Sequence, residues 1–110
     1  MYVQKADSVV RKKVRDEGAK KVTIQLLIDK HKARTFVMRR FFVERGGETP
    51  LHEHSWEHEV YILKGYGIVT DGKVKHKIGP NTVVYVPPNQ KHQFKNIGRS
   101  TFSFLCLIPK

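Results

Sequence analysis

Four of the six histidines in the sequence are spaced so that they could bind one metal ion. They fall within a short window and are His52, His54, His58 and His92. Neutral imidazole is the commonest metal ligand in proteins, and it holds divalent transition metals at about 2.0–2.2 Å. Side chains two positions apart on a strand point to the same face, so His52 and His54 can reach one ion together. These histidines therefore predict a site for one divalent transition-metal ion.

Residues 54–58 also have a second interpretation. Their sequence, His-Ser-Trp-Glu-His, matches the H-x-x-E-H motif of a class of zinc proteases, in which a helix places both histidines on the metal. The flanking residues do not favour a helix, because Gly46, Gly47 and Pro50 precede the segment. A strand-forming run at residues 60–63 follows it. We therefore reject the protease interpretation.

The rest of the chain indicates strands that could position these side chains. Short runs of β-branched and aromatic residues alternate with turn residues, and Asp71-Gly72 is a strong hairpin signal. Many short, closely spaced strands predict an all-β sandwich or barrel. The predicted strands lie at residues 22–28, 35–43, 51–54, 58–64, 67–70, 74–78, 82–86, 92–95 and 102–108. Residues 1–21 are expected to form an N-terminal arm or a short helix, and residues 22–110 the barrel.

Two spaced motifs give the chain a resemblance to the cupins. The first cupin motif, G-x5-H-x-H-x(3,4)-E-x6-G, is matched from Gly46 to Gly65, and the second, G-x5-P-x-G-x2-H-x3-N, from Asn81 to Asn96. The resemblance implies one antiparallel cupin-type β-barrel, also called a double-stranded β-helix or jelly roll, with a metal inside. Asn81 and Asn89 stand where the second motif has glycines, and asparagine tolerates the left-handed backbone of such turns.

The metal-binding glutamate of the first motif is replaced here by His58, which six residues separate from Gly65. Glu59 fits the longer spacing but leaves only five residues before Gly65, and alternation puts it on the opposite face from His58. We therefore predict His58 as the fourth ligand. The chain then resembles a small group of four-histidine, typically manganese-binding cupins. By ligand softness alone, four nitrogen ligands suit Fe, Zn, Ni or Cu better than Mn. Manganese is ranked first only because of the resemblance.

Four further side chains are candidates for the pocket around the ion. Phe104 and Cys106 share one face of the predicted strand 102–108 and line the pocket if that face points inward. Trp56 lies between two of the ligands, where it can rim the mouth, and Arg39 is a candidate partner for an anion. Simple packing is the alternative role for Cys106 and Trp56. No other residue is assigned a catalytic role.

Composition limits the other possibilities. The chain has 110 residues, enough for one domain, and a net charge of +11. Residues 1–45 contain thirteen basic and five acidic residues, and residues 46–110 contain eight basic and five acidic residues. The basic excess therefore lies mostly away from the four histidines. It carries no interleaved aromatics and no nucleic-acid motif, so we expect a solvated, lysine-rich surface and no nucleic-acid partner. Attraction of anionic substrates is the alternative role of this charge. The absence of a long apolar stretch, of a leader and of a second cysteine predicts a cytoplasmic protein with no membrane partner.

Two classes of function are compatible with this site. The first is an enzyme, namely a metal-dependent oxygenase or dioxygenase acting on a small anionic or enolisable molecule, or else an isomerase or decarboxylase that needs only the Lewis acid. The second is a non-catalytic small-molecule-binding or sensor cupin. The resemblance also implies a homodimer, for which Tyr61 and Leu63 offer apolar side chains on the face opposite His58.

Overall fold

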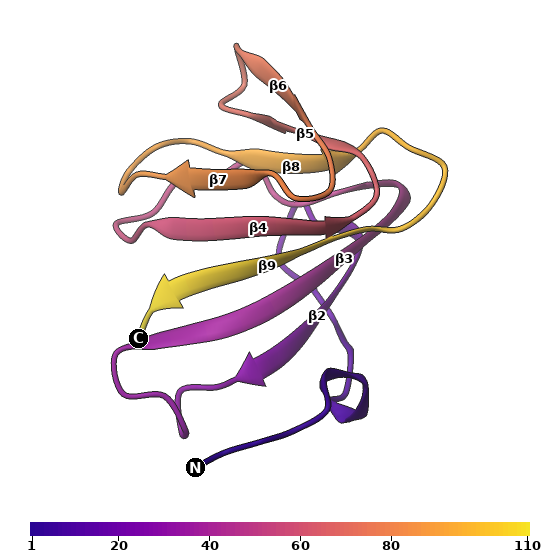
Figure 1. The fold of residues 1–110 in the computed structure, drawn as a ribbon. Helices are drawn as coiled ribbons and strands as arrows, with labels where there is room; N and C mark the ends of the chain where they lie inside the picture. Colours follow the sequence, from indigo (N-terminus) through magenta and orange to yellow (C-terminus); the bar gives the residue numbers. More distant parts are fainter.

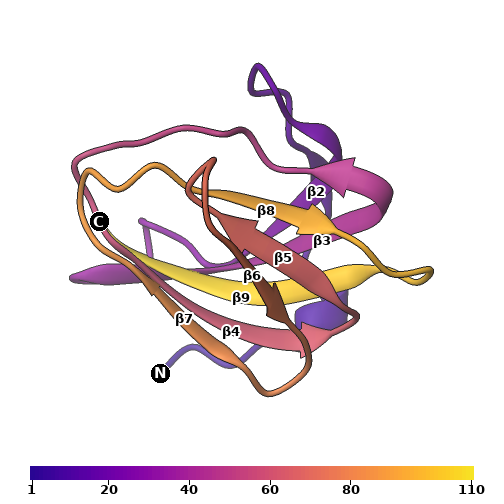
Figure 2. The ribbon, with the colours of Figure 1, turned by 90° about the horizontal axis from the view of Figure 1, so that it is seen from above.

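Nine β-strands and one 3-10 turn make up the computed structural model, which describes residues 1–110 (Figure 1). The elements are η1 Ala6–Ser8, β1 Lys12–Lys13, β2 Lys20–Ile28, β3 Phe36–Glu48, β4 His58–Lys64, β5 Gly67–Thr70, β6 Lys75–Ile78, β7 Val83–Val86, β8 Gln93–Asn96 and β9 Phe102–Pro109. All of the strands pair antiparallel in one sheet, in the order β6-β5-β8-β3-β9-β4-β7, with β2 on β3 and β1 on β2. Figure 2 shows this sheet curling on itself. The predicted all-β antiparallel barrel is therefore confirmed.

The long strand β3 connects the two halves of this barrel. It pairs with β2 and β9 along its length, and its last residue pairs with β8. The sequence predicted that this strand would end before Gly46 and Gly47, which is wrong, because the strand continues to Glu48. Gly46 has φ +77° and lies where the register with β2 shifts, so the glycines form a bulge instead of a turn. The bulge bends β3 across the barrel.

The predicted strand at residues 51–54 is also wrong. This segment is a loop with a single bridge, in which His52 and His92 exchange backbone hydrogen bonds of 3.2 and 2.9 Å. Pro50 lacks a backbone N–H, so a ladder cannot extend on that side of the bridge. The bridge nevertheless joins the two histidine segments that lie 40 residues apart in the chain.

The N-terminal segment packs against the barrel. It contains η1 and the two-residue strand β1, and no α-helix. The buried side chain of Gln25 on β2 donates hydrogen bonds of 2.9 Å to the carbonyls of Ala6 and Val9. The guanidinium of Arg11 lies 3.6 Å from the centre of the Phe42 ring. These contacts fix the arm on the sheet, and they place the residues that follow it beside the histidines.

The core lies between the two halves of the curled sheet. Phe94 and Phe104 stack at a centroid distance of 4.7 Å, and Phe102 packs at 5.3 Å from Phe104. Both Phe94 and Phe104 also form the wall of the pocket that holds the histidines. The chain has no helix with the length and apolar character needed to cross a membrane.

Candidate metal centre

The four predicted histidines converge from three segments of the barrel. His58 opens β4, His92 immediately precedes β8, and the bridged loop carries His52 and His54. One ring nitrogen from each of His52, His54 and His92 lies within 4.8 Å of the other two. His58 Nε2 lies 2.8 Å from His54 Nε2, and its ring centre is 4.8 Å from that of His92. Strand alternation turns the neighbouring Glu59 outward into solvent, as predicted.

Two of these rings are held in the tautomer that a metal needs. Nδ1 of His54 lies 3.0 Å from the carbonyl oxygen of Trp56, and Nδ1 of His92 lies 2.9 Å from that of Gln90. A carbonyl oxygen can only accept, so both Nδ1 atoms carry the proton. Each Nε2 is therefore unprotonated and carries a lone pair, and that of His54 lies 2.8 Å from His58 Nε2. Metal-binding histidines are oriented by such N–H donation to a backbone carbonyl.

His58 has a different neighbour. Its Nδ1 lies 3.0 Å from Cys106 Sγ and 3.4 Å from Arg39 Nη2, and Arg39 Nη2 donates to the same sulfur at 3.0 Å. When His58 Nε2 binds a metal, its Nδ1 is protonated, and Cys106 Sγ is placed to accept that hydrogen bond. Burial raises the pKa of the Cys106 thiol. The four imidazole nitrogens themselves form a donor set that fits a divalent transition metal.

The surroundings favour the neutral form of three of these histidines, His52, His58 and His92. Burial, followed by the nearby His92 and Arg39, lowers the pKa of His58 to about 3. Burial also lowers the pKa of His92 and of His52, both of which are ordinarily near 6.5. His58 and His92 are 7% and 5% exposed, whereas His52 and His54 are more open. Neutral rings are the form that binds a metal, so these three rings need no deprotonation at neutral pH.

The lowered pKa of His58 makes the metal-free protein sensitive to acid. Below pH 6.5 the unfolded chain protonates this histidine and the folded chain does not, so stability is full above pH 6.5 and falls towards pH 3. The expected slope from this one buried group is about 1.4 kcal/mol per pH unit. Urea unfolding of chelator-treated protein between pH 7 and 4.5 measures this slope. His58→Gln should flatten it and the exposed control His31→Gln should not; equal slopes in all three proteins would contradict the assignment.

The pocket around the histidines is small and largely apolar. Its volume is about 150 Å³, and Phe41, Phe94 and Phe104 form one wall. Trp56, which is 41% exposed, stacks on His54 with ring centres 4.0 Å apart and planes within 5°. The structure places the predicted candidates Phe104, Cys106, Trp56 and Arg39 all on this pocket.

Sequence reasoning missed six lining residues, Val14, Asp16, Phe41, Thr49, Pro50 and Phe94, and the first two of them come from the N-terminal arm. Val14 and Asp16 reach the pocket from the segment between β1 and β2. Asp16 is the only carboxylate that lines it. No local pattern marks Val14 and Asp16, because their position depends on how the arm docks on a distant part of the sheet.

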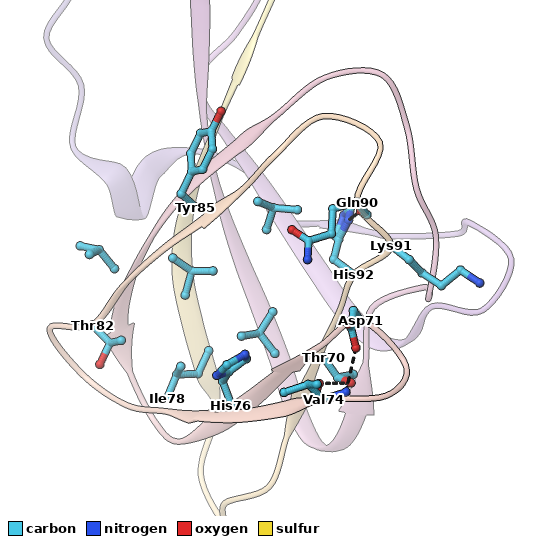
Figure 3. A pocket seen from close by; sticks show the side chains of 14 residues that line it. Thr70, Asp71, Val74, His76, Ile78, Thr82, Tyr85, Gln90, Lys91 and His92 are labelled. Atoms are coloured by element: carbon cyan, nitrogen blue, oxygen red, sulfur yellow. Dashed lines mark hydrogen bonds between the residues drawn. The ribbon is translucent and has the colours of Figure 1, made fainter.

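A larger hollow lies beside this pocket, between the β5–β6 hairpin and the edge strand β7 (Figure 3). Its volume is about 420 Å³, and His92 lines both cavities. Two of its polar side chains serve the hairpin turn. Thr70 Oγ1 donates to the Val74 carbonyl at 2.8 Å, and Asp71 accepts from the backbone N–H groups of Lys73 and Val74. Although it is the larger cavity, it gathers no comparable set of metal ligands.

An antiparallel barrel that gathers histidines from two spaced motifs around one pocket is the defining architecture of a metal-binding cupin. Residues 39–108 match the family described as Cupin domain, so the chain belongs to the cupin family.

Two curated relatives match parts of the chain. It is 32% identical over 97 residues to 1-methylthio-D-xylulose 5-phosphate methylsulfurylase of Rhodospirillum rubrum, a match that covers 86% of this chain and 62% of that protein. It is 34% identical over 74 residues to auxin-binding protein 1 of Arabidopsis thaliana, covering 59% of this chain and 37% of that protein. The chain therefore spans less than two thirds of the length of either relative.

Solved structures extend the likeness to nearly the whole chain. The polyketide cyclase RemF from Streptomyces resistomycificus superposes with a TM-score of 0.93 and 34% identity, covering 99% of this chain and 79% of that one. A predicted oxalate decarboxylase from Thermotoga maritima gives a TM-score of 0.86 with 24% identity and 98% coverage of both chains. The second likeness is one of fold alone.

Proposed function

We propose that the protein is a metal-dependent enzyme that binds one divalent transition-metal ion through His52, His54, His58 and His92. The observation that carries this proposal is the convergence of the four imidazoles. Two of them, His54 and His92, have an unprotonated Nε2 because their Nδ1 donates to a backbone carbonyl. Manganese is the first candidate, by resemblance to the four-histidine cupins, and Fe, Zn, Ni and Cu are the alternatives that nitrogen ligands suit. Because all four ligands are neutral, the bound ion keeps its double positive charge and supplies a strong Lewis acid.

The side chains of the pocket favour a small anionic or enolisable substrate. The aromatic wall makes one side of the pocket apolar, and an apolar surrounding strengthens electrostatic interactions with a bound substrate. Arg39 provides a fixed positive charge beside His58, and the net charge of +11 attracts anions towards the protein. Trp56 and the N-terminal arm narrow the mouth of the pocket.

Two classes of reaction are compatible with this arrangement. A non-oxidative ring closure, isomerisation or decarboxylation needs only polarisation of a substrate oxygen, and the likeness of almost the whole chain to a polyketide cyclase supports it. An oxygenase or dioxygenase reaction is the second candidate, supported by the all-histidine donor set, which also suits iron. The thiol of Cys106, 3.0 Å from a ligand nitrogen, would be exposed to oxidation in an oxygen-activating site. We therefore favour the non-oxidative class.

Oxygen uptake separates these classes. The protein is purified without a metal-affinity tag, its metal content is determined by element-specific mass spectrometry, and it is incubated with 1,3-diketones and small keto acids in an oxygen-electrode cell. We expect turnover that depends on the metal and consumes no oxygen. Turnover matched by oxygen uptake would identify an oxygenase instead. A tightly held ligand without turnover for any metal tested would favour the alternative of a non-catalytic binding or sensor cupin.

The homodimer stays a prediction. Tyr61 on β4 and Val83 and Tyr85 on β7 are exposed and, with Leu107, line one shallow apolar surface on the outside of the barrel. Burial of such a patch against a second copy would remove apolar area from water. We expect dimers in equilibrium sedimentation at micromolar concentration, and only monomers would exclude this interface.

A further inference from the structure

Arg39 is a half-buried cation without a counter-anion. The structure has a single ion pair between a basic and an acidic side chain, Lys95 with Glu48 at 4.0 Å, and it lies elsewhere. The Arg39 Nη2 atom contacts Cys106 Sγ and His58 Nδ1, and its Nε is buried with no hydrogen-bond partner. A guanidinium has five N–H donors and is always charged. Leaving such a charge unpaired costs free energy, which an incoming anion would recover.

The barrel holds this side chain against the metal pocket. Arg39 pairs across the sheet with Cys106, its guanidinium carbon lies 5.0 Å from the centre of the Phe41 ring, and both Arg39 and Phe41 line the pocket. The neighbouring Arg40 takes the other face of β3, where it lies over Phe42 and donates to Ser103 Oγ at 3.2 Å. The charge of Arg39 is therefore directed at the histidines by strand alternation.

We propose that Arg39 is the residue that binds the carboxylate of the substrate, next to His58 in the metal pocket. This inference rests on the proposed function, since it takes that pocket as the substrate site. A guanidinium matches a planar carboxylate with two parallel hydrogen bonds, which a point charge does not provide.

The remaining walls narrow the class of ligand further. Phe41, Phe94 and Phe104 favour a compact apolar or aromatic body joined to that carboxylate. Asp16, the one acidic side chain on the pocket, disfavours a second negative charge. The ligand class is therefore a small monocarboxylate with an apolar body, of a size that a cavity of about 150 Å³ admits.

The test uses metal-free protein, so that a bound ion cannot supply the affinity. Chelator-treated protein at constant ionic strength is titrated with benzoate and with its neutral isostere benzamide, by calorimetry. We expect benzoate to bind at least about tenfold more tightly than benzamide, because a charge-assisted hydrogen bond contributes more than a neutral one. Arg39→Gln should abolish this preference, and Arg39→Lys should restore only part of it.

Arg40→Gln is the matched control, since it removes the same charge one residue away on the opposite face. The preference should survive in this variant; an equal loss would show a non-specific charge effect and overturn the proposal. Unchanged benzoate binding by Arg39→Gln would overturn it as well. If Arg39→Gln does not fold, the Arg39 Nε–H resonance of the wild-type protein decides. It should shift on addition of benzoate, and a resonance that does not move overturns the proposal.

The same titration separates this proposal from the proposed function. If the metal-free protein binds benzoate but the histidines take up no metal, Arg39 remains an anion site and the proposed metal-dependent enzyme is contradicted. Metal uptake with no discrimination between benzoate and benzamide in the metal-free protein would do the reverse.

Discussion

Replacing His58 by alanine is expected to weaken the binding of manganese or zinc by about 100-fold or more. His58 is buried and has a neighbour at each ring nitrogen, with Cys106 near Nδ1 and His54 near Nε2. Removing a residue that only supports a metal ligand typically costs 10–100-fold in affinity, and loss of a ligand itself should cost at least the upper part of that range. Competition with a chelator of known affinity measures the change.

Glu59→Ala is the matched control, because Glu59 is the adjacent residue and the alternative ligand by motif spacing. Its side chain is exposed on the outer face, so its loss should leave metal affinity unchanged. Weaker metal binding by Glu59→Ala together with unchanged binding by His58→Ala would instead identify Glu59 as the fourth ligand. Chelator should also lower the melting temperature of the wild-type protein and of Glu59→Ala, and lower that of His58→Ala much less. An ion at 100 times its Kd stabilises the folded state by about 2.7 kcal/mol.

Replacing Phe104 by alanine is expected to lower the free energy of unfolding by about 3–5 kcal/mol. This ring is 1% exposed and packs between Phe94, Phe102 and Phe41, with centroid distances of 4.7, 5.3 and 5.5 Å. Its loss opens a cavity between the core and the metal pocket. Since a domain of this kind is stable by only about 5–15 kcal/mol, the loss is a large fraction of the whole.

Chemical unfolding in urea measures this loss, with Phe36→Ala as its control. Phe36 is the same residue type at the start of β3, but it is 59% exposed, so its loss should change stability by no more than about 0.5 kcal/mol. Equal losses in the two variants would show that the Phe104 ring is not part of the cooperative core.

The convergence of the four histidines was largely predictable from the sequence because the place of each depends on a local pattern. Motif spacing placed His58 in the cluster, and strand alternation separated it from Glu59. Asn81 and Asn89 have φ of 64° and 65°, which confirms that they occupy turn positions normally held by glycine. The phase of Arg39 could be settled only by the pairing of β3 with β9.

Features that depend on distant parts of the chain were not predictable in this way. Gly46 and Gly47 give a turn signal, but pairing with β2 and β8 carries β3 through them as a bulge. The loop that holds His52 and His54 has strand-like residues, yet it meets its partner only at one bridge. Asp16 lines the pocket because the N-terminal arm docks on the sheet. This docking is set by tertiary packing, which local sequence preference does not reveal.

The pairing of β3 with β9 has a consequence for how the site is assembled during folding. Arg39 and Cys106 are 67 residues apart, and each can reach the other only after a long loop has closed. Contacts of such large sequence separation form slowly, and they require the last strand to be present. A nascent chain can expose His52, His54 and His58 to the cell before β9 has been synthesised, but it cannot yet offer the enclosed pocket. Selective metal capture is therefore expected to follow translation, when the ion pool of the compartment in which the chain completes folding decides which metal is bound.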